Sequence, residues 1–267
     1  MMEEIIETPE PLLADATQFY DNLAEDYDTM TGFEKRFIHE KPFFNLLMRR
    51  FGITTALDAG AGTGFHSLLL AQLGAHMTAM DVSSKMLEHV KAHAKDLHIK
   101  IDLVESNFQD MPHRVNKKFD AVLCMGNSLP HLLTYQELAQ SLKNFSSVLR
   151  PGGILFLQLL NYARILTSRE RVQSVKEARG MTFVRFYEFH EKFVVFNILR
   201  LKKEEGRLVH KLDSVKLRPI LKPELTSALH EAGFDDLRIH GSIALDDFCE
   251  QTSKDLVVLA LKRKAMN

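Results

Sequence analysis

The hydrophobic positions along the middle of the chain follow two different periods. Short apolar runs of strand length occupy residues 54–59, 76–80, 100–104, 119–125 and 154–160. Segments with apolar side chains at helical spacing lie between most of these runs, at residues 65–73, 83–97 and 136–149. Because strands that alternate with helices form parallel sheets covered on both faces, this pattern predicts an α/β fold. Ligands bind such sheets at the carboxyl ends of the strands.

The pattern differs on either side of this region. Helical spacing predicts two helices before it, at residues 16–30 and 38–51. After Asn161 the alternation of strands and helices stops, and residues 182–201 and 208–217 indicate half-buried antiparallel strands joined by a turn at Glu205-Gly206. A helix at residues 223–232 and strands at residues 237–240 and 256–261 follow. We therefore expect residues 162–220 to form an inserted hairpin or small sheet.

Composition narrows the class of protein. The 267 residues are 45% hydrophobic and 26% charged, which is typical of a globular protein with a full core. With 34 basic and 35 acidic side chains the net charge is -1, which argues against a nucleic-acid partner. The first ten residues are acidic, unlike a secretory signal, and the apolar run at 154–160 is too short to span a bilayer. We expect a cytoplasmic protein with no membrane partner, whose two cysteines stay reduced.

The strongest chemical motif is Leu57-Asp58-Ala59-Gly60-Ala61-Gly62-Thr63-Gly64, at a predicted turn from strand to helix. Glycines at such a turn let the backbone approach a ligand, and the helix that follows offers free amides. The spacing differs from the Gly-x-Gly-x-x-Gly of dinucleotide sites, and Asp58 precedes the first glycine. A carboxylate there repels a diphosphate, so the motif favours a cationic cofactor without phosphate.

Polar side chains follow the next three predicted strands. Asp81, after the second strand, is placed to accept hydrogen bonds from both ribose hydroxyls; the alternative is a cap of the next helix. After the third strand, Asn107 suits an adenine edge and Phe108 its face; the alternative is a plain turn. The loop Cys124–His131 follows the fourth strand, where the reactive end of a cofactor meets its substrate.

The glycine loop, the acid after the second strand, the polar and aromatic pair after the third and the loop after the fourth follow one another as in a known family. Residues 54–160 therefore resemble the class I S-adenosylmethionine-dependent methyltransferases. The narrower resemblance is to the glycine and glycine/sarcosine N-methyltransferases. It rests on Asp81-Val82-Ser83-Ser84-Lys85-Met86-Leu87, Asn107-Phe108, the segment from Phe119 to Ser128 with His131, and Asn161-Tyr162. The resemblance implies a single domain with a Rossmann-like fold, in which helices cover both faces of a mostly parallel seven-stranded sheet. That domain consists of N-terminal lid helices (1–53), a cofactor-binding core (54–160), a small antiparallel insertion that caps the substrate (161–220) and a C-terminal completion of the sheet (221–267).

The resemblance also implies the cofactor and its contacts. The cofactor is S-adenosylmethionine, the product is S-adenosylhomocysteine, and no metal takes part. Tyr20 and Tyr27 match lid tyrosines, and Arg36 matches an arginine that holds the methionyl carboxylate. The expected cofactor-binding residues are Tyr20, Tyr27, Arg36, Asp58, Gly60, Ala61, Gly62, Gly64, Asp81, Val82, Met86, Asn107, Phe108, Cys124, Met125 and Gly126. The expected catalytic residues are Asn127 and Tyr162, with His131 as a base or polar orienter.

One position departs from the family. The glycine-methylating enzymes carry an arginine that binds the substrate carboxylate directly before the Asn-Tyr pair, whereas this chain has Leu160. Glycine is therefore not the expected acceptor unless Arg164 or Arg185 takes over that role. Other candidates for the acceptor pocket are Tyr162, Tyr187 and His210.

We expect a methyltransferase that acts on a small molecule, at an amine nitrogen. Methylation of oxygen or carbon is the alternative within the same class, and a catalytically silent protein that binds S-adenosylmethionine is the alternative from another class. The Phe-rich strands at residues 183–198 either cover the active site or meet another subunit, so the oligomeric state is open. His89 and His93 share a predicted helix face, but two histidines make only half a zinc site, and no metal is expected there.

Overall fold

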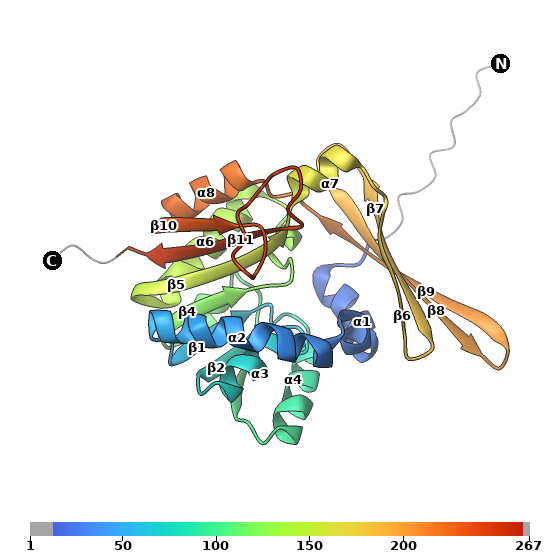
Figure 1. The fold of residues 1–267 in the computed structure, drawn as a ribbon, viewed down its shortest axis with the longest axis horizontal. Coiled ribbons are helices and arrows are strands. Elements are labelled where there is room, and N and C mark those ends of the chain that lie inside the picture. Colours follow the sequence, from blue (N-terminus) through green and yellow to red (C-terminus); the bar gives the residue numbers. More distant parts are fainter. Residues whose placement is uncertain (1–12, 264–267) are drawn as a thin grey trace, which may run out of the picture.

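The computed structural model describes residues 13–263, and Figure 1 shows their arrangement. The acidic first ten residues, and Lys264 of the basic C-terminal tail, lie outside the described residues. A seven-stranded sheet forms the centre, in the order β10-β11-β5-β4-β1-β2-β3. Its strands are β1 (Thr55–Ala59), β2 (His76–Asp81), β3 (Ile101–Glu105), β4 (Phe119–Cys124), β5 (Leu149–Leu160), β10 (Phe234–His240) and β11 (Asp255–Lys262). β11 runs antiparallel to both of its neighbours, and the pairs among β1 to β5 are parallel.

Helices cover both faces of this sheet. The helices α2 (Phe33–Phe51), α3 (Phe65–Gln72) and α4 (Ser84–Asp96) lie on one face, and α5 (Met111–Arg114), α6 (Tyr135–Val148) and α8 (Lys222–Glu231) lie on the other. Alternate residues of a strand point to opposite faces, so each strand supplies both cores. In β1, Ala56 packs against the first group of helices and Leu57 against the second. The order of strands reverses between β1 and β4, which is where ligands bind in such folds.

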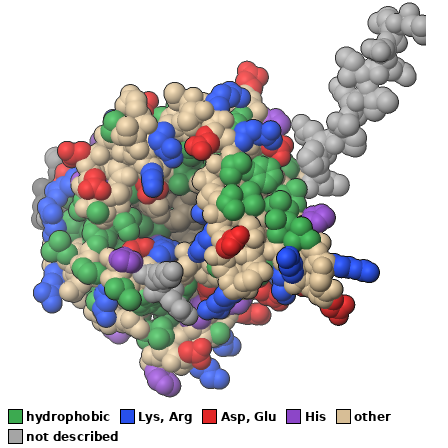
Figure 2. All heavy atoms as spheres, turned by 45° about the vertical axis from the view of Figure 1, so that its right-hand side comes forward, with side chains coloured by type: hydrophobic (Ala, Val, Ile, Leu, Met, Phe, Trp, Pro, Cys, Tyr) green, Lys and Arg blue, Asp and Glu red, His purple; other side chains and the backbone are tan. Residues whose placement is uncertain are grey.

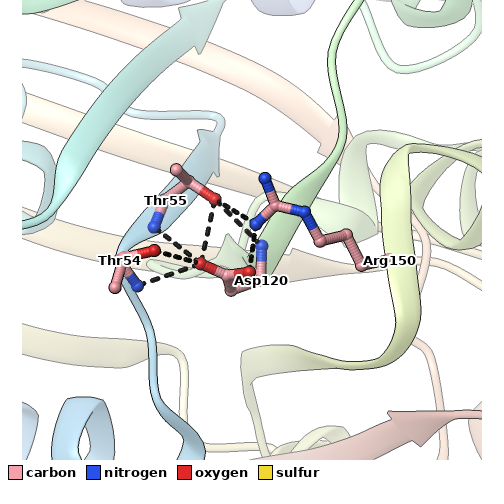
Figure 3. Close-up of polar contacts among 4 residues, drawn as sticks. All are labelled: Thr54, Thr55, Asp120 and Arg150. Carbon is pink, nitrogen blue, oxygen red and sulfur yellow. Dashed lines mark hydrogen bonds and ion pairs between the residues drawn. The ribbon is translucent and has the colours of Figure 1, made fainter.

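A polar cluster fixes the amino-terminal ends of the central strands (Figure 3). Thr54 and Thr55 each donate a backbone N–H and a hydroxyl to Asp120 Oδ2, over distances of 2.8–3.0 Å. Arg150, at the start of β5, pairs with Oδ1 of the same carboxylate. One side chain therefore joins the starts of β1, β4 and β5, at the edge opposite to their carboxyl ends.

A second, antiparallel sheet projects beyond the carboxyl edge of the first. It has the order β6-β7-β8-β9, from β6 (Val172–Ala178), β7 (Met181–Phe189), β8 (Val194–Glu204) and β9 (Arg207–Leu217). Helix α1 (Ala16–Thr31) packs on its inner face, where Phe183 and Tyr187 meet Phe19 and Leu23 in a third apolar core. The aromatic face of these strands therefore covers α1 and the neighbouring cavity.

The predicted fold class is confirmed. Elements that the pattern did not predict are the short helix α5 in the core and, in the insertion, the helix α7 (Tyr162–Ser168) and the strand β6. β6 reads Val-Gln-Ser-Val-Lys-Glu-Ala, which is too polar and irregular to indicate a strand by itself. The loop after β4 also contains a short 3-10 helix, η1 (Leu129–His131). Within residues 13–263, no helix is long and apolar enough to cross a membrane.

Candidate active site

The glycine loop is held against the neighbouring strand by its backbone. The amides of Gly60 and Ala61 both donate to the Met80 carbonyl, at 2.8 and 2.9 Å. Gly60 has φ +78°, and a Cβ there would lie 2.7 Å from Ser128 Oγ. Gly60 is therefore required by backbone conformation and by the close approach of the loop after β4. This contact brings the ends of β1 and β4 together.

Asp81 connects the glycine loop to the end of β2. One carboxylate oxygen accepts from the amide of Gly62 at 2.8 Å and the other from the amide of Ser83 at 3.0 Å. The side chain is buried, and burial raises the pKa of Asp81 to about 6 despite these two hydrogen bonds. Ser83 caps α4 by accepting from Met86 N, so the capping role that competed for Asp81 belongs to Ser83.

A first cavity of about 370 Å³ opens at the carboxyl ends of β1, β2, β3 and β4. In Figure 2 the surface is hollowed near its centre, with basic side chains beside the recess. Most of the expected cofactor-binding residues line this first cavity: Tyr20, Tyr27, Arg36, Gly60, Ala61, Gly62, Asp81, Val82, Asn107, Phe108, Met125 and Gly126. It also includes residues that the sequence did not single out, such as Ser106, Gln109 and Glu137.

Four expected contacts do not line the cavity. Asp58 is buried behind the loop, where Oδ2 accepts from the amide and hydroxyl of Ser67 at the start of α3. Gly64 begins the same helix with φ +88°. Met86 packs in the third apolar core, and Cys124 is buried in the sheet, where burial raises the pKa of its thiol. These four residues lie behind the cavity wall: Asp58 and Cys124 are buried on strands, Gly64 begins α3, and Met86 is buried on α4.

The side chain of Asn107 is engaged in a turn. Its Nδ2 donates to Asp110 Oδ2 at 2.9 Å, and its Oδ1 accepts from Asp110 N at 2.7 Å. Phe108 packs edge-on against Phe145, with ring centroids 5.2 Å apart, and also lines the first cavity. The turn that competed with an adenine contact is therefore present in the structure, while both residues lie at the cavity.

A second cavity, also about 370 Å³, lies between the carboxyl edge of the seven-stranded main sheet and the antiparallel sheet β6–β9, which we call the cap sheet. It shares part of its wall with the first cavity: Tyr20, Tyr27, Thr31, Arg36, His66, Met125, Gly126 and His131 line both.

Asn127 lines the second cavity and has φ +69°, a conformation that asparagine tolerates. Its Nδ2 donates to Tyr162 Oη and its Oδ1 accepts from Leu160 N, both at 3.0 Å. Tyr162 does not line either cavity; it is buried and orients Asn127.

His131 lies where the two cavities meet. Its Nε2 is 3.0 Å from Tyr20 Oη, and its Nδ1 is buried with no hydrogen-bond partner among the described residues. Burial lowers the pKa of His131 to about 4, so the imidazole is neutral near neutral pH. Burial likewise raises the pKa of Tyr20 well above its usual value. The pair therefore offers uncharged hydrogen-bonding groups, and the low pKa argues for an orienting role of His131 rather than for a base.

A charged cluster from α2 and α3 borders both cavities. Arg36 Nε donates to Glu40 Oε1 at 2.7 Å, and His66 Nε2 lies 3.3 Å from Glu40 Oε2. Burial would raise the pKa of Glu40, but the hydrogen bonds and charges of His66 and Arg36 outweigh it and lower that pKa. Glu40 is therefore an ionised partner that fixes the Arg36 guanidinium at the cavity wall. The sequence indicated Arg36 but not Glu40 or His66, since only the packing of α2 on α3 brings them together.

The cap sheet supplies three polar side chains to the wall of the second cavity, those of Gln173, Arg185 and Tyr187. Arg185 Nε donates to Ser174 Oγ at 2.8 Å, which is the one hydrogen bond of this side chain within residues 13–263, and burial lowers the pKa of its guanidinium. Tyr187 Oη and Gln173 Oε1 are buried without a hydrogen-bond partner in the described part of the chain. A buried polar group without a partner is costly, so this arrangement indicates a polar ligand.

Two other candidates from the sequence lie elsewhere. His210 is exposed on the part of β9 that projects away from the main sheet, opposite Leu201 of β8, and it does not line the cavity. Arg164 lies on α7 and lines neither cavity. Of the two arginines considered as replacements for the missing family arginine, Arg185 is the one at the cavity wall.

Comparison with known proteins agrees with this geometry. The family model described as a methyltransferase domain matches residues 56–153. A glycine/sarcosine N-methyltransferase from Aphanothece halophytica is 28% identical over 239 residues, which cover 89% of this chain and 86% of that protein. The human glycine N-methyltransferase is 35% identical over 135 residues, 46% of each chain. The crystal structure of an S-adenosylmethionine-dependent methyltransferase from Clostridium acetobutylicum has a TM-score of 0.79, at 15% identity, and covers 91% of this chain and 99% of that one.

The fold, the glycine loop and these matches identify the chain as a class I S-adenosylmethionine-dependent methyltransferase. Within that class the chain is similar to glycine/sarcosine N-methyltransferases, at 28% identity. The first cavity fits the cofactor in its chemistry. Gly60 leaves room for a close backbone approach, Asp81 directs a buried carboxylate to the cavity, and the volume lies in the range of small-molecule sites.

Proposed function

We propose that the protein methylates the amine nitrogen of a small molecule that also carries an anionic group, which Arg185 binds. The observation that carries this proposal is the second cavity, whose wall holds the Arg185 guanidinium, bonded through Nε to Ser174 Oγ, beside Tyr187 Oη and Gln173 Oε1, which are buried without a partner among the described residues. A guanidinium matches a carboxylate or phosphate oxygen pair. The names of the matched relatives, which include glycine/sarcosine N-methyltransferases, support an amine as the acceptor.

We propose that the first cavity holds S-adenosylmethionine, which supplies an electrophilic methyl group when bound. Asp81 accepts the ribose hydroxyls, Asn107 and Phe108 border the adenine, and Arg36, fixed by Glu40, meets the methionyl carboxylate. Tyr20 and Tyr27 close the cavity from the lid helix α1. Asp58, Gly64, Met86 and Cys124 hold these groups in place from behind.

The chain's contribution to the reaction is alignment and the control of charge. An amine attacks only in its neutral form, and burial in a pocket without an unpaired carboxylate favours that form. Glu40 is paired with Arg36, and Asp255, which also lines the second cavity, accepts a hydrogen bond from Gln158 Nε2 at 3.1 Å. Asn127, held by Tyr162, fixes the loop after β4, and neutral His131 orients the acceptor. Alignment of this kind accounts for many kcal/mol of a methyl-transfer barrier.

The proposal is tested by turnover on matched pairs of small amines. Each amino acid is offered beside its amide and its methyl ester, and S-adenosylhomocysteine formation is measured together with the mass of the product. We expect turnover for carboxylated amines and at least a tenfold lower kcat/KM for the uncharged partners, about 1.4 kcal/mol. Methylation at oxygen or carbon would replace the amine proposal, and cofactor binding without turnover across the panel would favour a silent binding protein.

Variants of the two arginines separate the anchor from general effects of charge. Arg185→Gln should raise the KM of the carboxylated acceptor more than it lowers kcat, since the lost contact serves ground-state binding. Arg164→Gln is the matched control, because Arg164 carries the same charge on the neighbouring helix α7 without lining the cavity. Equal effects of the two variants would contradict an anchor at Arg185. The cytoplasmic location stays a prediction from the sequence.

A further inference from the structure

We propose that Asp28, His89 and His93 form a binding site for a transition-metal ion, with Zn²⁺ as its probe, between the lid helix α1 and α4. A carboxylate oxygen of Asp28 and a ring nitrogen of each histidine lie within 4.8 Å of one another. His89 and His93 are four residues apart on α4 and so share one helix face. Asp28 reaches the same point from α1 and supplies the ligand that the two histidines lack on their own.

The hydrogen bonds of His93 prepare its ring for an ion. Its Nδ1 lies 3.2 Å from the Thr63 carbonyl oxygen, an acceptor, so this nitrogen carries the proton. Nε2 then faces Asp28 Oδ2 at 3.1 Å. Histidine ligands of metals commonly donate their other ring N–H to a backbone carbonyl in this way. The second oxygen of the carboxylate, Asp28 Oδ1, is buried with no hydrogen-bond partner among the described residues.

The three side chains match the chemistry of zinc. Two imidazoles and one carboxylate are a common set for Zn²⁺, and water completes the tetrahedron. A groove of about 540 Å³, lined by Asp28 and His93, leads from solvent to this point and gives the ion a path of entry. All three residues are partly exposed, so the ion need not shed all of its water.

An ion at this point would tie the lid to the cofactor loop. Tyr27, the neighbour of Asp28 on α1, lines both cavities, and Thr63, which holds His93, lines the first. Bound Zn²⁺ therefore fixes α1 across the mouth of the first cavity and slows its opening. The effect on cofactor release rests on the proposed function, whereas binding of the ion does not.

The test titrates Zn²⁺ into tag-free full-length protein by calorimetry, without cofactor. Every variant also carries Cys249→Ser, which removes the exposed thiol. We expect one ion per chain, with affinity lowered at least tenfold by His89→Ala and by Asp28→Asn. His89→Ala is the sharper variant, because the contact between His93 and Asp28 remains. The matched control is His39→Ala, an exposed histidine on α2 that should leave the affinity unchanged.

A second readout reports on the ligand set itself. Co²⁺ added in place of Zn²⁺ should give the intense visible absorption of a tetrahedral site in the parent protein, and weak octahedral bands in His89→Ala. Hydrogen exchange of α1 should slow with Zn²⁺ in the parent and not in His89→Ala. If all variants bind Zn²⁺ with one affinity, or the parent binds none, Asp28 and His93 form an ion pair only and the proposal is wrong. Turnover without metal, measured separately, tests the proposed function alone.

Discussion

At the scale of single residues, burial sets the charge of the groups around the two cavities. It raises the pKa of Asp81 to about 6, lowers that of His131 to about 4 and lowers that of Arg185. Each shift disfavours the charged form, as desolvation requires. Near neutral pH the site therefore presents an ionised Asp81 at the end of β2 and a neutral His131 where the cavities meet.

The shifted pKa of Asp81 predicts how cofactor binding depends on pH. The ribose hydroxyls need an ionised acceptor, so affinity for S-adenosylhomocysteine should fall about tenfold per pH unit below pH 6. Calorimetry at intervals from pH 5 to pH 8 measures this dependence. Asp81→Asn should bind weakly and show no change over the same range, and a parent protein with equal affinity at pH 5 and pH 7 would contradict the role of Asp81.

The pKa of Asp81 makes the stability of the fold depend on pH in the opposite direction to cofactor binding. The folded state holds the Asp81 proton more tightly than the unfolded chain, whose carboxyl has the ordinary pKa of 3.8. The contribution of this group to the free energy of unfolding is therefore full below about pH 4 and is lost as the pH rises through 6. The fold tolerates an ionised Asp81 at neutral pH because the amides of Gly62 and Ser83 compensate part of the cost.

The candidate residues that follow strands come together at one cavity. Asp81 ends β2 and Gly126 lies two residues after β4, and topology alone brings such strand ends together. Gln173 and Arg185 belong to the cap sheet, whose strand pairing depends on contacts between distant segments. The sequence therefore did not indicate Gln173 at the cavity, and it named Arg185 only as one of two alternatives. Asp28 joins His93 only because α1 packs on α4.

At the scale of elements, hydrophobic periodicity predicted the strands and helices of the core. It did not predict elements whose sequence is polar or irregular. The core strands carry continuous apolar runs because both of their faces are buried. β6 is an edge strand of the cap with alternating exposed residues, so it lacks that signal. The sequence also did not indicate the polar cluster at the amino ends of the core strands, although Asp120 joins the starts of β1, β4 and β5 there.

Asp120 gives a prediction about stability that involves no substrate. Burial alone would raise its pKa, but hydrogen bonds from Thr54 and Thr55 and the ion pair with Arg150 hold that pKa well below its usual range. Its contribution to the free energy of unfolding is therefore full above about pH 4 and is lost as the pH falls further. Asp120→Ala should lower the free energy of unfolding at pH 7 by about 1.5–3 kcal/mol, as measured by urea denaturation.

The control for Asp120 is an exposed pair of the same kind. Asp102→Ala removes a carboxylate that meets Lys117 at 2.6 Å, on the surface at the start of β3. We expect a change of less than about 1 kcal/mol there. If the two variants lose equal stability, or if the Asp120 effect is the same at pH 3 and pH 7, the cluster does not join the strands as inferred.

At the scale of the whole molecule, the chain encloses its cavities between two sheets of different kinds. The main sheet supplies strand ends, the cap sheet supplies Arg185 and Tyr187, and α1 lies between them as a lid. The lid is joined to the cap by a buried ion pair network. Arg200 of β8 pairs with Asp26 of α1 at 2.6 Å and with Asp213 of β9, whose Oδ1 accepts from Asn22 of α1 at 3.0 Å.

This network gives a prediction about the docking of the lid. Arg200→Met leaves the Asp213 carboxylate buried without its cation, which should lower the free energy of unfolding by about 3–5 kcal/mol. Protease cleavage within α1 should also become faster, because the tie to Asp26 is lost. Denaturation and limited proteolysis measure the two effects. Lys202→Met, on the same strand, is the matched control, since Lys202 is exposed and, among residues 13–263, forms an ion pair only with Glu204, at 3.2 Å.

A second substitution separates the unpaired charge from the lost contact with the lid. In Arg200→Met/Asp213→Leu the buried carboxylate is also removed, so most of the stability should return. Cleavage within α1 should stay fast, because the ion pair between β8 and α1 is still absent. If the double variant regains both stability and protection, packing alone docks α1 on the cap. An Arg200→Met effect as small as that of Lys202→Met would show that the network does not hold the lid.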